Sequence, residues 1–359
     1  MLIFLCAAQI SDAQFQTNPE PKLTQINLDK YGWQPPQPPH RGEFTSRSQP
    51  LTIDHRGRIL VGFTIREQAI GLATRERPGL SFHIVRFAPD GKLELSLTLP
   101  TNNWRQNGVY LDKADDLIAR ANDTVQMLTS SGEREGGHNW ESLESCGPRC
   151  EIQQSFSRGT LRLVNLDAKP PVTILQDSPP HVVRRCERPE LPNDHLTDTF
   201  FYFVMGGPIG PTPMLYRWPL CDFAQHTEMQ AATGGAIGAL NDESLVIIEN
   251  KAVVVQSVDG SVKFRSKMPK NDIPENWVQS SANGDRFAVS IATWRGGFTA
   301  LDVSSNRVAR RIAVYETATG TELASVAVAP HATIALAMSP DGHRIAVLAN
   351  GTVTIADIP

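Results

Sequence analysis

The chain has 359 residues, of which 40% are hydrophobic and 20% charged, and its formal net charge at pH 7 is −4. This mild negative charge provides no electrostatic basis for binding nucleic acid or an anionic membrane surface, and we expect neither as a partner. The 26 glycines and 26 prolines favour many short strands joined by turns over long helices.

Residues 1–13 are expected to be a secretory signal peptide. Leu2–Ala8 is a short apolar run, and Ser11–Ala13 places small residues where a signal peptidase cleaves. No basic residue precedes Lys22 and the apolar run is short, so a soluble N-terminal tail is the alternative. No other segment approaches the roughly 18 apolar residues that span a bilayer. We therefore expect a secreted or periplasmic protein, with no membrane span.

Residues 14–50 are predicted to hold an N-terminal strand followed by a linker. The strand is "KLTQINLD" at 22–29, and the linker is the proline-rich segment 31–44, "YGWQPPQPPHRGEF". Proline favours an extended backbone, so 31–44 is interpreted as an extended link into the next domain. A peptide ligand for another domain is the alternative interpretation.

Five later segments share one pattern, in which a short apolar strand, a polar turn with Asp, Gly or Asn, and a strand rich in β-branched residues follow one another. They are 51–64, 109–122, 237–250, 278–293 and 334–350. Three further segments hold two strands around a glycine-containing turn, at 82–97, 252–266 and 311–326. Alternation with a period of two around such turns predicts β-hairpins. A degenerate sixth copy is expected between Val182 and Met205, and 150–176 is a candidate seventh.

The two hairpin types together form a four-stranded unit that recurs along residues 51–359. Such a meander cannot bury both of its faces alone, whereas sheets stacked radially around an axis bury them against each other. We therefore predict an all-β fold, a β-propeller with six or seven four-stranded blades. The last copy ends after its third strand, at 352–357, and we expect the N-terminal strand to supply the fourth and close the ring.

The final repeat also supports a family resemblance. Ser339-Pro340-Asp341-Gly342, followed by "HRIAVLANGTVTIADI", resembles the bacterial propeller repeats of the YVTN and WD40-like families, and "ETATGTELASVAV" at 316–328 is similar to their outer-strand turns. The similarity extends over about 237–359, and the WD dipeptide is absent. The resemblance implies the fold and a habit of binding proteins or ligands at a face of the ring, without implying an activity.

The cysteines of the mature chain are predicted to form disulfides. Without Cys6 their number is even, as is typical of proteins in an oxidising compartment. The expected pairs are Cys146 with Cys150 and Cys186 with Cys221, although three connectivities are possible. Free thiols and a metal site are the alternatives, and the spacing lacks the paired C-x-x-C of a zinc site.

Catalytic motifs such as G-x-S-x-G, H-E-x-x-H and the phosphate-binding glycine loops are missing from the sequence. The glycines at 234, 235 and 238 are interpreted as turn glycines. The loop 131–150 is the largest insertion, and long loops often carry function. Within it, His138 and Trp140 are the candidate binding residues, with an ordinary surface loop as the alternative.

A propeller channel can also gather ligands for a metal ion. Three histidines, His55, His181 and His331, are placed near the starts of inner strands. Five aspartates lie in the repeat turns, and turn capping is the favoured interpretation of them. They are Asp54, Asp112, Asp115, Asp242 and Asp341. The tryptophans, for instance Trp218 and Trp277, are expected to pack in the core or between blades, and a sugar- or partner-binding aromatic platform is the alternative.

These patterns favour a secreted, monomeric propeller that binds a protein or small-molecule partner, uses no cofactor and performs no catalysis. A metal-dependent propeller hydrolase of the lactonase type is the alternative. A scaffold for cell-envelope assembly is a third possibility.

Overall fold

The computed structural model describes residues 21–35, 50–66, 80–101, 107–111, 115, 117–121, 252–257, 259–295 and 306–359. Between residues 124 and 249 it describes the strands named below and two flanking residues, and for β8–β16 the backbone alone. A 3-10 helix, η1 (Leu28–Tyr31), follows the first strand. Among the described residues, no helix has the length and apolar character needed to span a membrane.

The described strands form seven antiparallel sheets, of which six have four strands and one has three. The first two sheets hold β2 (Leu51–Ile53), β3 (Ile59–Arg66), β4 (Leu80–Phe87) and β5 (Leu93–Thr101), then β6 (Gly108–Leu111), β7 (Leu117–Ala121), β8 (Thr124–Leu128) and β9 (Arg134–Asn139). The next two hold β10 (Cys150–Ser155), β11 (Thr160–Asn165) and β12 (Val172–Leu175), then β13 (His195–Leu196), β14 (Phe200–Met205), β15 (Met214–Pro219) and β16 (Thr227–Gln230).

Two sheets from the C-terminal half follow the same order. They hold β17 (Ala236–Ala239), β18 (Leu245–Glu249), β19 (Ala252–Gln256) and β20 (Val262–Lys267), then β21 (Asp272–Ser280), β22 (Arg286–Trp294), β23 (Arg307–Glu316) and β24 (Glu322–Val328). The last sheet joins both ends of the chain and has the order β1 (Leu23–Asn27), β27 (Thr352–Asp357), β26 (Arg344–Ala349), β25 (Ile334–Met338). In it β1 runs antiparallel to β27, with Leu23 opposite Ala356.

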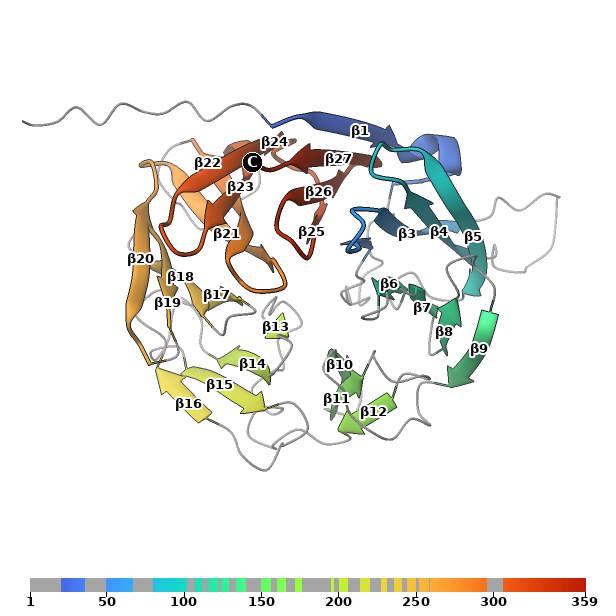
Figure 1. Ribbon diagram of the computed structural model, residues 1–359, viewed down its shortest axis with the longest axis horizontal. Coiled ribbons are helices and arrows are strands. Elements are labelled where there is room, and N and C mark those ends of the chain that lie inside the picture. Colours follow the sequence, from blue (N-terminus) through green and yellow to red (C-terminus); the bar gives the residue numbers. More distant parts are fainter. Residues whose placement is uncertain are drawn as a thin grey trace, which may run out of the picture.

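The sheets follow one another around a common centre in the order of the sequence (Figure 1). First strands such as β6, β17 and β25 lie nearest the centre, and last strands such as β5, β9 and β20 lie at the outside. This radial arrangement of antiparallel sheets is that of a β-propeller.

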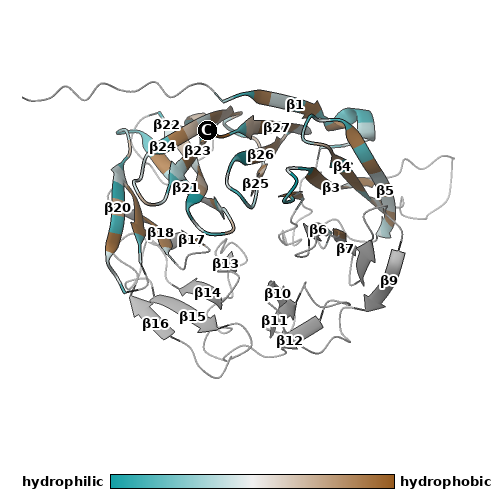
Figure 2. Ribbon diagram, viewed as in Figure 1, coloured by the Kyte–Doolittle hydropathy of each residue, from teal (hydrophilic) through white to brown (hydrophobic). Residues whose placement is uncertain are grey.

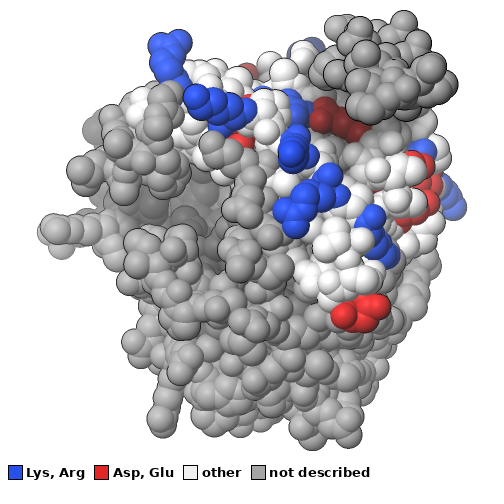
Figure 3. All heavy atoms as spheres, turned by 90° about the vertical axis from the view of Figure 1, so that its left-hand side faces the viewer, with Lys and Arg blue, Asp and Glu red and all other residues white. Residues whose placement is uncertain are grey.

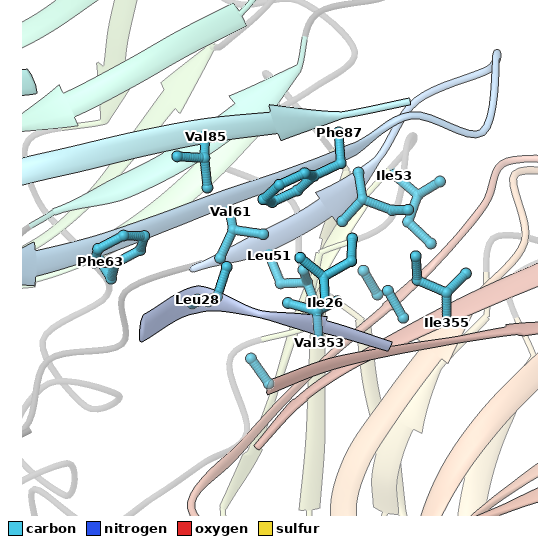
Figure 4. Close-up of a cluster of buried hydrophobic side chains, with 14 of the residues drawn as sticks. Ile26, Leu28, Leu51, Ile53, Val61, Phe63, Val85, Phe87, Val353 and Ile355 are labelled. Atoms are coloured by element: carbon cyan, nitrogen blue, oxygen red, sulfur yellow. The ribbon is translucent and has the colours of Figure 1, made fainter. Parts of the chain in front are cut away.

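The hydrophobic core is divided among the interfaces between neighbouring sheets. Among the described residues four clusters are seen, and each joins two sheets that are consecutive around the ring. Alternate residues of one strand serve two clusters: Val61 and Phe63 face the last sheet, whereas Leu60 faces the sheet of β6. Figure 4 shows the first cluster, in which Ile26 and Val353 pack against the strands β2–β4. Three sheets take part in two clusters each and are therefore buried on both faces, as the radial stacking requires: the last sheet, the sheet of β2–β5 and the sheet of β21–β24.

The structure confirms the predicted hairpins. All five inner hairpins and the three outer ones pair as antiparallel neighbours. The candidate seventh segment, 150–176, contains β10–β12, and the degenerate copy contains β13 and β14.

Two details of the backbone differ from expectation. Tyr31, the first residue of the segment 31–44, ends the helix η1, and Gly32 caps that helix in the left-handed conformation; residues 36–44 of the expected linker lie outside the described residues. Gly238 was interpreted as a turn glycine, yet it lies inside β17. A Cβ atom at Gly238 would lie 2.6 Å from Cβ of Val278, so the glycine allows two neighbouring sheets to approach closely.

Candidate interaction surface at the inner turns

One end of the ring carries the turns that join the first and second strands of the sheets. Three of them are fully described, at 54–58, 281–286 and 339–344, and we call this end of the ring the turn face. Figure 2 shows these turns as hydrophilic segments close to the centre of the ring. The turn face therefore presents polar side chains on a frame of buried strands.

The three turns use the same backbone hydrogen bonds. The first residue of each turn, Asp54, Ser281 or Ser339, donates a backbone hydrogen bond to the carbonyl of the last residue of the turn. Its carbonyl also accepts a hydrogen bond from the amide of a glycine with φ between 72° and 75°. Glycine adopts this left-handed conformation without the steric cost of a Cβ atom. The repeated Gly of the sequence motif is thus a geometric requirement.

Side chains of the first turn residues complete the turns. The carboxylate of Asp54 accepts hydrogen bonds from the amides of Arg56 and Arg58, at 2.9 and 2.8 Å, and also pairs with the Arg58 guanidinium. Ser339 plays the same part in its turn, since its hydroxyl accepts from the Arg344 amide at 2.9 Å. The interpretation of Asp54 as a turn-capping residue is confirmed.

Asp341 is also a capping residue. Its Oδ1 atom accepts hydrogen bonds from the Ser339 hydroxyl at 2.5 Å and from the His343 amide at 3.0 Å. Partial burial acts to raise the pKa of Asp341, but these hydrogen bonds and the neighbouring His343 outweigh it, and the pKa is lowered from its ordinary value. The carboxylate is therefore held in its charged form as part of the turn.

Side chains link each turn to the turn of the next sheet. Arg286 Nη1 lies 3.0 Å from Nδ1 of His343, and the Ala282 amide donates to the Pro340 carbonyl at 2.8 Å. In the following sheet, Arg344 donates from Nη1 to the Gly57 carbonyl at 3.1 Å.

The series continues through His55, whose Nδ1 atom lies 2.8 Å from Oδ1 of Asp115 in the sheet of β6. The His55 side chain remains 52% exposed, whereas Asp115 is 11% exposed. Together these contacts join four consecutive sheets across the turn face. They fix the relative positions of polar groups that come from distant parts of the sequence.

Two of the three histidines that were placed near inner strands are described, and they lie at opposite ends of the ring. His55 was placed near the start of an inner strand, but it follows the end of β2. His331 precedes the start of β25, at the opposite end of the ring from the turn face. His181, Asp112 and Asp242 lie outside the described residues. Among the residues that are described, no group of three His, Cys, Asp or Glu side chains is placed to hold a metal ion.

The side chains of the other predicted site residues lie outside the described part of the chain, and His138, expected in the loop 131–150, lies in the strand β9. Trp140, Cys146, Cys186 and Cys221 are not described, and for His138 and Cys150 only the strand backbone is. Of the tryptophans, Trp33 is confirmed as a packing residue, because it lies partly buried against the first core cluster.

A buried ionic cluster was missed by the sequence analysis. Glu275, at the irregular centre of β21, pairs with Arg310 at 2.6 Å and with Arg307 at 2.9 Å. The Ser290 hydroxyl donates to the same carboxylate at 2.6 Å. Burial lowers the pKa of Arg310, and the charge of Glu275 opposes this shift. The sequence signal was an arginine at a core-facing position of an apolar strand, in "RVARRIAVYE".

Comparisons with known proteins add little to this description. No protein-family model matches the chain, and no curated protein is similar to it in sequence. Among solved structures, the β-propeller domain of Cps50 (Swd1) from Myceliophteria thermophila is 11% identical, with a TM-score of 0.44 over 83% of this chain and 100% of that one.

Two further similar structures are BBS1N, solved in complex with ARL6DN, and a chain of a mitotic checkpoint complex. The first is 12% identical with a TM-score of 0.45, covering 89% of this chain and 94% of that one. The second is 12% identical with a TM-score of 0.48, covering 99% and 98%. Such values are too low to bear on function, and the propeller architecture rests on the sheets of this chain.

Proposed function

We propose that this protein is a non-catalytic β-propeller scaffold that binds a protein partner through its turn face. In this proposal residues 51–359 form seven blades, and β1 closes the ring by completing the last sheet. Seven antiparallel sheets among the described strands, and the pairing of β1 with β27, support this organisation. A relation to bacterial YVTN-type repeats rests on the sequence resemblance of the final repeat and of 316–328.

The observation that carries the proposal is the series of contacts between successive turns. Arg286, Arg344 and His55 each join one turn to the next sheet. A surface whose polar groups are already held in place loses less conformational entropy when a partner binds, so it is suited to recognition. The exposed side chains that remain, such as Arg56, are spread over several sheets, as suits a macromolecular partner better than a small ligand.

The carboxylates of the turn face support a binding role over hydrolysis. A hydrolase of the lactonase type needs oxygen ligands directed at a metal ion. Here Asp54 and Asp341 are engaged by backbone amides of their own turns, and Asp115 is engaged by His55. These groups act as structural acceptors.

We further propose that the mature protein is secreted or periplasmic and carries two disulfides. The N-terminal apolar run and the even number of the remaining cysteines support this. Intact mass measurement of the protein from its native compartment tests it. We expect a mass that lacks residues 1–13, and we expect no thiol to react with an alkylating agent before reduction. Four free thiols would contradict the proposal.

The turn-face proposal is tested by site-specific photo-crosslinking in the full chain. A crosslinking side chain at Arg56, on the turn face, is compared with one at Lys30, which lies at the opposite end of the ring. We expect a discrete protein adduct from position 56 and none from position 30. Equal adducts at both positions, or none at position 56, would contradict the proposal.

Elemental analysis of the purified, dialysed protein tests the competing hydrolase function. We expect no stoichiometric divalent ion. One bound ion per chain, together with ester hydrolysis lost on chelation, would replace the scaffold proposal by the metal-dependent one.

A further inference from the structure

We infer that the outer edge of β20 binds an extended acidic segment of a partner protein, which adds to the sheet as a fifth strand. β20 is the last strand of its sheet, and none of the described strands pairs with its outer edge. Such an edge presents backbone amides and carbonyls to an added strand. This surface lies on the side of the ring and is distinct from the turn face.

Arg265 and Lys267 form a short row of cations on one face of β20, and Lys263 is the extra residue of the irregularity beside the turn. Lys263, Arg265 and Lys267 are exposed and alternate with half-buried residues. Figure 3 shows Lys and Arg side chains gathered on the side of the ring where β20 lies. Residues two apart on a strand are separated by about 6.6 Å and point to the same face of the sheet. The row therefore offers positive charges at the spacing of alternate residues in a partner strand.

The other face of β20 is anchored by one aromatic ring. Phe264 stacks against Phe287 of the next sheet, with ring centroids 6.1 Å apart. Val262 pairs with Gln256, and the extra residue Lys263 therefore places it on the face of Arg265 and Lys267, where it is 52% exposed. In Figure 2 hydrophilic and hydrophobic segments alternate along β20. An added strand would thus meet cations on one face and Phe264 on the other.

The equivalent strands β5 and β24 lack the charge pattern of β20. β5, β20 and β24 each contain one extra residue next to the turn, at Glu94, Lys263 and Leu323. This shared irregularity aligns the three strands residue by residue. The positions that match Arg265 and Lys267 are Ser96 and Thr98 in β5, and Ser325 and Ala327 in β24.

Protection of the sheet edge is the simplest alternative explanation of these cations. Lysines on edge strands commonly discourage pairing between sheet edges. If protection alone were needed, the equally peripheral β5 and β24 would be expected to carry cations at the matching positions, but they carry Ser, Thr and Ala. A specific acidic partner explains why β20 carries cations at positions where β5 and β24 carry none.

The predicted partner segment alternates acidic and apolar residues. Its carboxylates would lie beside Arg265 and Lys267, and the residue between them would lie on the side of Phe264. A nucleic acid is a poorer fit, because the chain is acidic overall and the edge of β20 offers backbone hydrogen bonds that only a peptide strand can complete.

The test uses the full chain and a fluorescent eight-residue peptide with glutamate and valine in alternation. Fluorescence anisotropy measures its binding to the wild type and to the double variant Arg265→Ser, Lys267→Ala, which carries the residues found in other sheets. We expect the double variant to bind about tenfold more weakly. A peptide with alternate backbone nitrogens methylated cannot form strand hydrogen bonds, and we expect it to bind at least tenfold more weakly to the wild type.

The matched control removes the same charge elsewhere, with Lys30→Ser and Lys92→Ser, and we expect binding within twofold of wild type. Equal losses in control and double variant would reduce the effect to net charge and overturn the inference. The inference would also be overturned if the double variant aggregated but still bound the peptide as the wild type does. The cations would then serve only to protect the edge of the sheet. Binding of a DNA duplex but not the peptide would also overturn the inference. Each of these contrary results would leave the turn-face proposal intact, because the two surfaces are probed separately.

Discussion

The sheet that joins the two chain ends has two unlike neighbours. Toward β2–β5 its interface is a continuous apolar cluster, in which Ile26 and Val353 meet Phe87 (Figure 4). Toward β21–β24 the interface also has an apolar centre, but it is bordered by the buried ionic cluster of Glu275. Arg310 reaches across this border and donates to the Ala332 carbonyl at 2.7 Å.

The two interfaces differ in what they contribute to the fold. Apolar burial is non-directional, so the first interface gains stability without fixing a precise orientation of the sheets. A buried ion pair adds little net stability, because removing the charges from water is costly, but it strongly penalises arrangements that separate the pair. We therefore expect the first interface to supply strength and the second to supply orientation.

The largest effect is expected in the apolar interface. Phe87→Ala removes a fully buried ring from the first cluster and should lower the free energy of unfolding by roughly 4 kcal/mol. Urea denaturation followed by tryptophan fluorescence measures this. The control is Leu93→Ala, at an exposed position 38% accessible to solvent, which should change stability little. Equal effects of the two substitutions would remove the assigned role of the cluster.

The ionic interface should respond differently to single and paired changes. Glu275→Met leaves Arg310 buried without its partner and should cost about 3 kcal/mol. The pair Glu275→Met with Arg310→Met should be more stable than the single variant, because the uncompensated charge is gone. The same denaturation experiment checks this, and additive losses would show that the two groups are not coupled.

A third interface tests close approach between sheets. Gly62 of β3 would place a Cβ atom 2.6 Å from Phe82 Cζ and 2.9 Å from Val109 Cγ1. Gly62→Val should therefore destabilise the protein by about 2 kcal/mol through overpacking. Thermal unfolding measures the change, with Thr98→Val at an exposed position of β5 as a comparison. A neutral Gly62→Val would mean that the sheets can separate at little cost.

A smaller effect is expected in the turn beside the ionic interface. Ser339→Ala removes the hydroxyl that accepts from the Arg344 amide and donates to Asp341. The loss should be about 1 kcal/mol, the usual contribution of such a hydrogen bond. Hydrogen exchange at the Arg344 amide should accelerate in this variant, and unchanged exchange would contradict the capping role.

The smallest effect concerns pH. The pKa of Asp341 is lowered in the folded protein, so its contribution to stability is present above the pKa of the unfolded chain, about 3.9, and is lost as the pH falls through the folded pKa. Asp341→Asn should therefore reduce the fall in stability below pH 4. The dependence of stability on pH near pH 7 should be the same in both proteins. An identical acid profile for both proteins would count against this assignment.

Period-two alternation and turn chemistry were sufficient to predict the hairpins. Strands such as β25 and β26, around Ser339–Gly342, are recognisable because one face must be apolar and the turn must contain glycine. Gly238 was misjudged because a glycine inside a strand and one in a turn look alike in the sequence. Only the approach of Val278 from the next sheet distinguishes them.

The sequence by itself determined the local elements of this protein: its hairpins, their order and the capping role of Asp54. Tertiary structure alone decided which polar groups meet. His55 and Asp115 are 60 positions apart, and Arg344 and Gly57 are 287 positions apart. The physical reason is that hairpin formation depends on neighbours in the chain, whereas contacts between neighbouring sheets depend on how the sheets are packed around the axis of the ring.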